Sequence, residues 1–402
     1  KIYNKTFVGI DFGTSTTVVS IASYDRGSNQ IMCTTLELPQ KEIDGNIVES
    51  ELLPSVIAVG RDGAPLVGMG AFSLKTNPDY ELGTNIWYSF KMELGKDLGP
   101  MWYGSEIEQI KSPQDATRFF FKYLKRCIEK VCADNNYSPD IHYAVSIPAS
   151  FESNQRRDLL DALSANGIVL SGSNLIDEPN AAFIGYVNPD IYNKEPIELS
   201  EGYNPKVLVF DFGAGTCDIS ILEISADYKG YHTKNLSISQ FSELGGNNID
   251  DYIARTYLLP KILELNNVDK DEYTSKQIDC IVKQLWGVAE LRKIKICKNF
   301  IFLLDDREFL DDALAHNKCT VINKSIEIYT DYVTLQQDKF SLSYKSFIDT
   351  MNVFFSKDVF SPSRSDKMRR KYNSIYATLD SAISKAHIDI DEIDYVMMIG
   401  GS

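Results

Sequence analysis

The sequence contains an internal repeat whose offset is half the length of the chain. Residues 7–21 read FVGIDFGTSTTVVSI and residues 207–221 read VLVFDFGAGTCDISI, an offset of 200 without a gap. The identical pairs are Asp11/Asp211, Phe12/Phe212, Gly13/Gly213, Thr16/Thr216, Ser20/Ser220 and Ile21/Ile221. This offset is far longer than the repeat of a solenoid, so it predicts two related lobes built on the same unit.

Each copy of the repeat predicts a strand, a tight turn and a second strand. Largely apolar residues fill 7–10 and 207–210 without alternating with polar ones, a pattern typical of a strand buried on both faces. Asp-Phe-Gly ends each run, and β-branched residues resume at 16–19 and 218–222.

The remaining sequence alternates helical and strand patterns, which predicts an α/β fold. Helical spacing of apolar residues occurs at 115–130, 154–165, 180–186, 249–259, 276–297 and 372–385. Strands are expected at 142–148 and at 396–399, and the second is expected to be buried because it is fully apolar. Residues 300–342 contain β-rich pieces and are expected to form an insertion.

The two turns have the composition of an anion-binding site. Thr14, Ser15 and Thr16 supply hydroxyls, and the glycines of both turns let backbone N–H groups approach an oxyanion closely. A carboxylate beside a phosphate needs a cation between them, and Mg²⁺ is held by one or two carboxylates next to substrate phosphates. We therefore expect Asp11 and Asp211 to face each other across a cleft. One such turn closes many ordinary hairpins, but two in equal phase favour a ligand site.

Composition and charge exclude several classes of protein. The 402 residues include 41 basic and 56 acidic side chains, a net charge of −15, which disfavours a nucleic-acid partner. No apolar run reaches the roughly 18 residues of a membrane helix, so no membrane partner is expected. The seven cysteines form no C-x-x-C pair, which favours reduced thiols and a cytoplasmic location.

Seven segments resemble a known family. GIDFGTSTT (9–17) and VFDFGAGTCDISIL (209–222) resemble the first and second phosphate motifs of the actin-like ATPase superfamily. Within it, the chain is most similar to the nucleotide-binding domain of the seventy-kilodalton heat-shock chaperones. The other segments that resemble this family, in its order, are SIPASFESNQRRDLLDA (146–162), LIDEPNAAFIGY (175–186), ELGGNNIDDYI (243–253), VAELRKIKIC (288–297) and VMMIGGS (396–402).

The resemblance implies an α/β, actin-like ATPase fold of two related lobes that binds ATP or ADP with Mg²⁺ in the cleft. By resemblance, Asp11 and Asp211 hold the hydrated Mg²⁺, Glu178 positions the attacking water, and Asp218 and Thr216 assist near the γ-phosphate. The implied phosphate-binding residues are Gly13, Thr14, Ser15, Thr16, Gly213, Ala214, Gly215 and Thr216.

The resemblance also implies a nucleoside end of the cleft. Glu290 and Lys293 are expected to bind the ribose and the adenine edge. The other residues assigned to nucleotide binding are Gly245, Gly246, Asn247, Ile294, Cys297, Gly400, Gly401 and Ser402. Pro148 and Arg156 match positions that the family uses for coupling between lobes and for partner contact; a strand end and a solvated helix residue are the plainer interpretations.

The chain departs from the family pattern at the reacting end of the cleft. The family has a lysine after V-G-D-A-A that reaches the γ-phosphate, whereas residues 67–71 read VGMGA and Phe72 follows. Lys75 lies one helical turn later and is a candidate catalytic cation; the alternatives are another cation or very slow hydrolysis. Asn247 replaces a glutamate, which also predicts weak ATPase activity.

The base-binding positions differ from the family pattern too. Ile294 and Cys297 replace an arginine and a serine and leave an apolar shelf that can still pack a purine.

The resemblance also implies the organisation of the chain. Lobe I is expected at 1–190 with an inserted subdomain at about 37–112, and lobe II at 191–402 with an inserted subdomain at about 243–345, truncated at its C-terminus.

Three functions remain open at this point. The first is an ATP-binding, slowly hydrolysing chaperone-like protein, with a co-chaperone or nucleotide-exchange factor and a client as partners. The second is a small-molecule kinase of the same fold. The third is a specialised actin-like ATPase, such as a filament protein or a nucleotide sensor. The second and third match 146–162 and 175–186 poorly.

Overall fold

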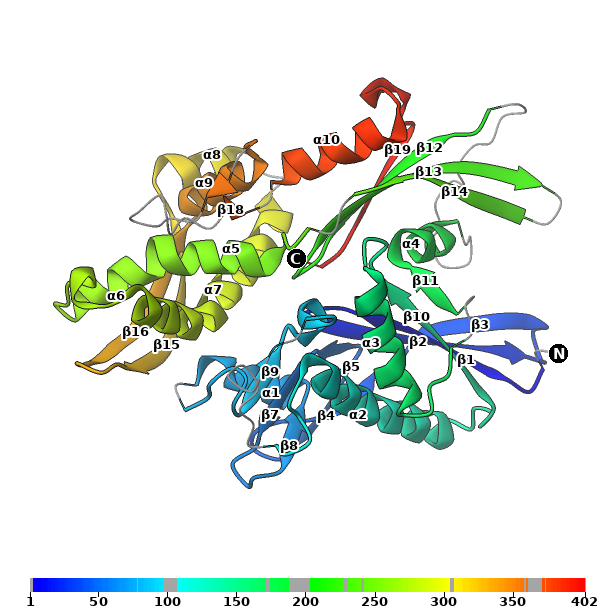
Figure 1. Ribbon diagram of the computed structural model, residues 1–402, viewed down its shortest axis with the longest axis horizontal. Coiled ribbons are helices and arrows are strands. Elements are labelled where there is room, and N and C mark those ends of the chain that lie inside the picture. The colour runs from blue at the N-terminus through cyan, green and yellow to red at the C-terminus, as the bar shows by residue number, and fades with distance from the viewer. Residues whose placement is uncertain are drawn as a thin grey trace.

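The computed structural model describes residues 3–401 except 78, 97, 99–106, 171–173, 188–202, 228–229, 240–241, 304–306, 358, 361–370 and 373. Ser402, assigned above to the base of the nucleotide site, lies outside the described residues. Figure 1 shows two lobes, one drawn in blue to teal and the other in green to red, with helix α4 between their large sheets. None of the helices in the described part of the chain is long and apolar enough to cross a membrane.

The sheet of lobe I carries the first copy of the repeat. Its strands run in the order β11-β10-β1-β2-β3, and β6 also pairs with β2. Their bounds are β1 Thr6–Phe12, β2 Thr16–Asp25, β3 Gln30–Thr35, β6 Leu52–Pro54, β10 Ile141–Ile147 and β11 Leu175–Asp177. β1 is antiparallel to β2 and parallel to β10.

The sheet of lobe II repeats this arrangement. Its order is β14-β13-β12-β19, with β12 antiparallel to β13 and parallel to β19. The bounds are β12 Lys206–Phe212, β13 Cys217–Asp227, β14 Gly230–Ile238 and β19 Tyr395–Ile399. Asp211 stands opposite Asp218 where Asp11 stands opposite Val18. The two central strands have the same neighbours in the same directions, which confirms the structural repeat predicted from the sequence.

Helices α2 (Pro113–Asp134) and α3 (Ser153–Ser164) cover one face of the lobe I sheet (Figure 1). The Ser112 side chain caps α2 by accepting a hydrogen bond from the Asp115 backbone N–H. Phe12 packs among Phe120 and Phe121 of α2 at ring-centroid distances of 5.8 and 4.9 Å. This aromatic core holds the end of β1, and therefore Asp11, in a fixed place.

Helix α4 (Glu178–Tyr186) connects the lobes by packing against both. It follows directly on β11 and contacts β10 on the lobe I side. On the lobe II side, its buried Phe183 joins Val207, Val209 and Leu222 in one apolar cluster. The first residue of α4 is thereby held where the two sheets meet.

Smaller elements complete lobe I. They are β4 Leu38–Lys41, β5 Ile47–Ser50, β7 Val56–Val59, β8 Pro65–Val67, α1 Met69–Ser73, β9 Ile86–Tyr88, and the 3-10 helices η1 Leu74–Thr76 and η2 Phe90–Glu93. β7, β8 and β9 form a three-stranded sheet, and α1 packs on it.

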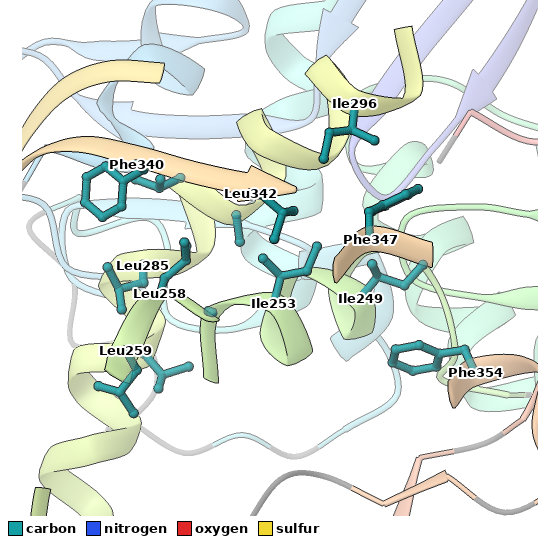
Figure 2. Close-up of a cluster of buried hydrophobic side chains, with 14 of the residues drawn as sticks. Ile249, Ile253, Leu258, Leu259, Leu285, Ile296, Phe340, Leu342, Phe347 and Phe354 are labelled. Carbon is teal, nitrogen blue, oxygen red and sulfur yellow. The ribbon is translucent and has the colours of Figure 1, made fainter. Parts of the chain in front are cut away.

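Lobe II adds a helical body and a hairpin. The elements are α5 Gly246–Ile253, a π-helical turn Ala254–Leu258, α6 Leu259–Leu265, α7 Ser275–Leu303, α8 Arg307–Ala315, β15 Cys319–Tyr329, β16 Thr334–Ser343, α9 Tyr344–Phe355, β17 Val359–Phe360, β18 Lys371–Tyr372 and α10 Ile375–Ala386. Figure 2 shows their core, in which Ile253 and Leu285 lie beneath Phe340 and Leu342 of β16. Of the β-rich region expected at 300–342, the strands are confirmed as the β15–β16 hairpin, whereas Arg307–Ala315 form helix α8.

Two expectations about burial were wrong. β1 alternates between buried and exposed residues, with Val8 and Ile10 inside and Phe7 37% exposed, because α2 and α3 cover only one face of the sheet. β19 lies at the edge of its sheet, and Val396 and Met398 are 61% and 69% exposed. An apolar run predicts a strand, but burial depends on what packs on it.

Candidate functional site

A cavity of about 590 Å³ lies between the two lobes, where the two Asp-Phe-Gly turns meet. Both aspartates of the repeat, Asp11 and Asp211, line it, and so does Glu178 at the start of α4. The other expected site residues that line it are Gly13, Thr14, Ser15, Thr16, Gly213, Ala214, Thr216, Gly400 and Gly401. Residues 200 positions apart in the sequence are therefore brought together in one cavity.

Local hydrogen bonds hold both turns. In lobe I, Ser55 donates its backbone N–H to the Ser15 carbonyl at 2.8 Å and its hydroxyl to the Gly13 carbonyl at 2.8 Å. In lobe II, the Gly213 N–H donates to the Thr216 carbonyl at 2.9 Å. These bonds use the carbonyl groups of the turns, so the loop geometry is fixed without consuming the Thr14 and Ser15 N–H groups that an anion would need.

Gly400 sits against the second turn in a conformation that favours glycine. Its φ is +96°, and a Cβ there would collide with the Phe212 carbonyl and lie 2.9 Å from Asp211 Oδ1. Only a residue without a side chain can bring the end of β19 this close to the aspartate.

Asp11, Glu178 and Asp211 line the cavity, and Asp218 stands opposite Asp211 on the neighbouring strand. Burial raises the pKa of Glu178, Asp211 and Asp218. Burial raises the pKa of Glu178 to about 8, and the charges of the neighbouring aspartates add to this shift, although the charge of Lys91 lowers the pKa. Burial and the charge of Asp218 raise the pKa of Asp211 to about 6. Burial also raises the pKa of Asp218, although Ser150 and Thr216 lower it, and Asp218 Oδ1 accepts a hydrogen bond from the Ser150 hydroxyl. Carboxyl groups crowded in this way raise one another's pKa, and a bound cation would lower these pKa values and stabilise the charged forms.

The donor set fits Mg²⁺. Asp218 Oδ2 is buried without a hydrogen-bond partner, and Asp11 Oδ1 accepts a single bond from the Ser146 hydroxyl at 2.8 Å. Within the described ranges, no group of three or more His, Cys, Asp or Glu side chains is placed so that it could hold a metal ion by itself. Hard oxygen donors, too few to enclose the ion alone, are the pattern of Mg²⁺ that keeps its waters and binds phosphate.

The expected nucleoside-binding residues on α7 are engaged in ion pairs. Glu290 accepts from Lys75 Nζ at 2.5 Å and from the Ser15 hydroxyl at 3.3 Å. Lys293 Nζ donates to Asp250 at 2.8 Å, and both side chains are buried. Neither Glu290 nor Lys293 is among the described residues that line the cavity. Their roles in nucleotide binding stay predictions, and so does the catalytic role of Lys75.

The remaining expected residues on α7 differ in exposure. Ile294 is 36% exposed, and Cys297 is half-buried against the lobe II core. Neither side chain lines the described cavity, so the apolar shelf for a purine stays a prediction.

Residues 245–247 brace the second turn from behind. The Gly246 N–H donates to the Gly213 carbonyl at 3.0 Å, and the Asn247 N–H donates to the Ala214 carbonyl at 2.7 Å. The Asn247 amide also crosses to lobe I, where it donates to the Ser89 hydroxyl at 3.0 Å. These contacts tie the position of the second turn to lobe I.

Pro148 and Arg156 belong to the segment that joins β10 to the start of α4, and Pro148 is buried. Arg156 donates to the carbonyls of Ala149 and Phe151 and to the Asp177 carboxylate at 3.0–3.2 Å. It thus connects the loop after β10, which begins at the buried Pro148, to the residue that precedes Glu178. Roles in partner contact stay predictions for both residues.

Sequence reasoning missed three side chains of the site. Ser146 and Ser150 contact Asp11 and Asp218, and Lys91 contacts Glu178. The two serines lie inside the segment 146–162 that was singled out, but no residue pattern marked their hydroxyls. Lys91 lies between Phe90 and Met92, and a lysine inside an apolar stretch was the one available signal that it is buried.

Two related lobes with one turn of each facing a shared cavity define the class: an α/β protein of the actin-like ATPase fold. A family model described as "Hsp70 protein" matches residues 87–299, more than half of the chain. The chain belongs to the Hsp70 family.

Individual relatives agree with this assignment. The chain is 28% identical over 294 residues to "Chaperone protein DnaK" of Endomicrobium trichonymphae and 30% identical over 290 residues to the protein of that name from Elusimicrobium minutum. Each match covers 72% of this chain and 40% of the relative. The chain thus matches less than half the length of these curated relatives.

Proposed function

We propose that this chain binds ATP or ADP with Mg²⁺ in the cavity between its lobes and acts as the nucleotide-dependent part of an Hsp70-type chaperone. The observation that carries the proposal is the meeting of Asp11, Asp211 and Glu178 with both glycine-rich turns in one cavity. Membership of the Hsp70 family supports it over a small-molecule kinase or a filament protein.

Each part of the cavity has a task in this proposal. The N–H groups and hydroxyls of the turns 13–16 and 213–216 bind the phosphates. Asp11 and Asp211 would hold Mg²⁺ through water, and the ion would supply positive charge that offsets the phosphate charge. Glu178 orients the water that attacks the terminal phosphorus, with Asp218 and Thr216 beside it. Positioning and electrostatics of this kind account for most of the catalysis of phosphoryl transfer.

The finer assignments belong to the same proposal. Glu290 and Lys293 contact the nucleoside once their present ion pairs rearrange, and ATP hydrolysis is weak. Lobe I spans 1–190 and lobe II spans 191–402, with inserted subdomains at about 37–112 and 243–345; the separate β7–β8–β9 sheet and the β15–β16 hairpin support these insertions. The partners are a nucleotide-exchange factor or co-chaperone and a client protein, and the location is the cytoplasm.

The test is calorimetric titration with ADP and with ATP, in the presence of Mg²⁺ and after EDTA. We expect binding that weakens when Mg²⁺ is removed. The double variant Asp11→Ala/Asp211→Ala should lose this Mg²⁺ dependence, whereas Asp62→Ala, which removes an exposed carboxylate in a surface turn, should retain it. Retained affinity and Mg²⁺ dependence in the double variant would refute the metal assignment.

A further inference from the structure

Lys91 is a buried cation at the inner end of the cavity. It lies in η2, between the buried side chains of Phe90 and Met92, and is itself 4% exposed. Its Nζ donates to Glu178 Oε1 at 3.0 Å and lies 5.6 Å from the ring centroids of both Phe12 and Phe151. A lysine is seldom buried unless it has a partner, so its position calls for an explanation.

The hydrogen bonds of Lys91 leave room for a ligand. Within the described part of the chain, Glu178 is the one hydrogen-bond acceptor of the ammonium group, which carries three protons. The group lines the cavity, and it is the one lysine or arginine among the described lining residues. An acceptor entering the cavity can therefore take a charge-assisted hydrogen bond without breaking an existing one.

Contacts from both lobes hold η2 in place. Ser89, which precedes it, has a left-handed backbone (φ 61°), and its hydroxyl accepts from Asn247 of lobe II. Met92, within η2, fills the space beside Gly215 of lobe II, where a Cβ would lie 2.5 Å from its sulfur. The ammonium is thus positioned before any ligand binds, which is the condition for electrostatic catalysis without reorganisation.

The other candidate cation is placed differently. Lys75 donates to Glu290 of α7 and lines a separate cavity of about 240 Å³ beside Tyr80 and Lys283. Phe72, which stands where the resemblance places a lysine, packs against the apolar cluster of α1 and β7. Neither is placed beside Glu178.

We propose that Lys91 is the cation that contacts the terminal phosphate of the bound nucleotide and stabilises the charge that develops there during hydrolysis. The inference rests on the proposed function. In the reaction, the water oxygen bonds to the terminal phosphorus while the bond from that phosphorus to the bridging oxygen breaks. ADP keeps the electron pair, one water proton stays on the phosphate product, and the other passes to solution.

The experiment compares Lys91→Met and Lys91→Arg with Lys75→Met and with Lys96→Met, a surface control. Single-turnover hydrolysis is measured with enzyme in excess, and Kd is measured for ADP and for a non-hydrolysable ATP analogue. Loss of one placed charged donor lowers such rates about 10²–10³-fold. We expect that loss in Lys91→Met, partial recovery in Lys91→Arg and an unchanged rate in Lys96→Met.

The two affinities separate a contact with the terminal phosphate from a general structural role. We expect Lys91→Met to weaken binding of the ATP analogue about tenfold or more, while ADP affinity changes less than about threefold. If the single variant folds poorly, the double variant Lys91→Met/Glu178→Gln replaces it, because it leaves no unpaired buried carboxylate. We expect the same difference between the two affinities in this variant.

Three results would overturn the inference. An unchanged rate and an unchanged preference for the ATP analogue in Lys91→Met would do so, and so would loss of rate in Lys75→Met alone. A wild-type chain that binds neither nucleotide would refute the proposed function, and the inference with it. Ordinary binding and hydrolysis that do not depend on Lys91 would refute the inference alone.

Discussion

Two lysine–glutamate pairs join the lobes and differ mainly in burial. Lys75–Glu290 and Lys96–Glu243 both have N···O distances of 2.5 Å. The side chains of the first pair are each 10% exposed, and those of the second are 41% and 54% exposed. Because geometry is matched, comparing them isolates the effect of burial on a contact between lobes.

We predict that breaking the buried pair destabilises the chain by about 3 kcal/mol, at the low end of the range for removing one partner of a buried ion pair. The reason for the low end is that Glu290 keeps other partners in Lys75→Met. Burial raises its pKa, but Lys75, Lys293 and the Ser15 hydroxyl lower it, and the net pKa is below the ordinary value. The exposed pair should contribute about 0.5 kcal/mol or less because water screens it.

The assay is a pair of double-mutant cycles by urea unfolding without nucleotide. One cycle uses Lys75→Met, Glu290→Gln and the double variant; the other uses Lys96→Met, Glu243→Gln and their combination. We expect a coupling energy of about 1–3 kcal/mol in the first cycle and close to zero in the second. Equal coupling in both cycles would show that burial does not strengthen this contact, and the reasoning would fail.

Three further predictions concern buried polar groups. Burial raises the pKa of Asp250 to about 6, above its unfolded value of 3.8, so its contribution to stability is largest at low pH and is lost as pH rises through 6. When the pH is lowered from 7 to 5, the unfolding free energy of the wild type should rise by about 1 kcal/mol relative to that of Asp250→Asn, and the absence of any difference would contradict the shift. Arg292 is fully buried, and burial lowers its pKa to about 10, so Arg292→Met should leave the urea midpoint of unfolding unchanged or raise it. A clearly lower midpoint would show that the hydrogen bond from Arg292 to Thr320 stabilises the fold by more than burial of the charge costs. Burial raises the pKa of Cys217 to about 12, so maleimide should label Cys217 only after unfolding, whereas it should label the exposed Cys280 in the folded protein. Fast labelling of Cys217 in the folded protein, detected by mass spectrometry, would contradict its placement in the lobe II core.

The local pattern of the chain predicted much of its architecture. The repeat at 7–21 and 207–221 predicted two strand–turn–strand units, and both occur with the same neighbouring strands. Helix patterns also predicted α2 and α3 within a few residues of their ends and the start of α7, although α7 continues to Leu303, beyond the predicted end at 297. These features depend on residue spacing and turn chemistry, which are properties of short segments.

Burial was not predictable in the same way. β19 is as apolar as a central strand, yet only Met397 and Ile399 pack against the cluster of α4 and β12, and Val396 and Met398 on the other face are exposed. The alternation in β1 depends equally on helices that pack on one face alone. No local pattern records which surface of a strand another element will cover.

The carboxylates of the site were predictable, but the cation beside them was not. Asp11, Asp211 and Glu178 lie in segments with recognisable motifs, and all three line the cavity. Lys75 and Lys91 carry the same side chain 16 positions apart, and the apolar neighbours of Lys91 indicate burial but not which carboxylate it meets. Their partners do: Lys75 reaches Glu290 of α7, and Lys91 reaches Glu178 at the start of α4. A lysine is directed by charges that are distant in sequence, so only the packing of the two lobes decided which one faces the cavity.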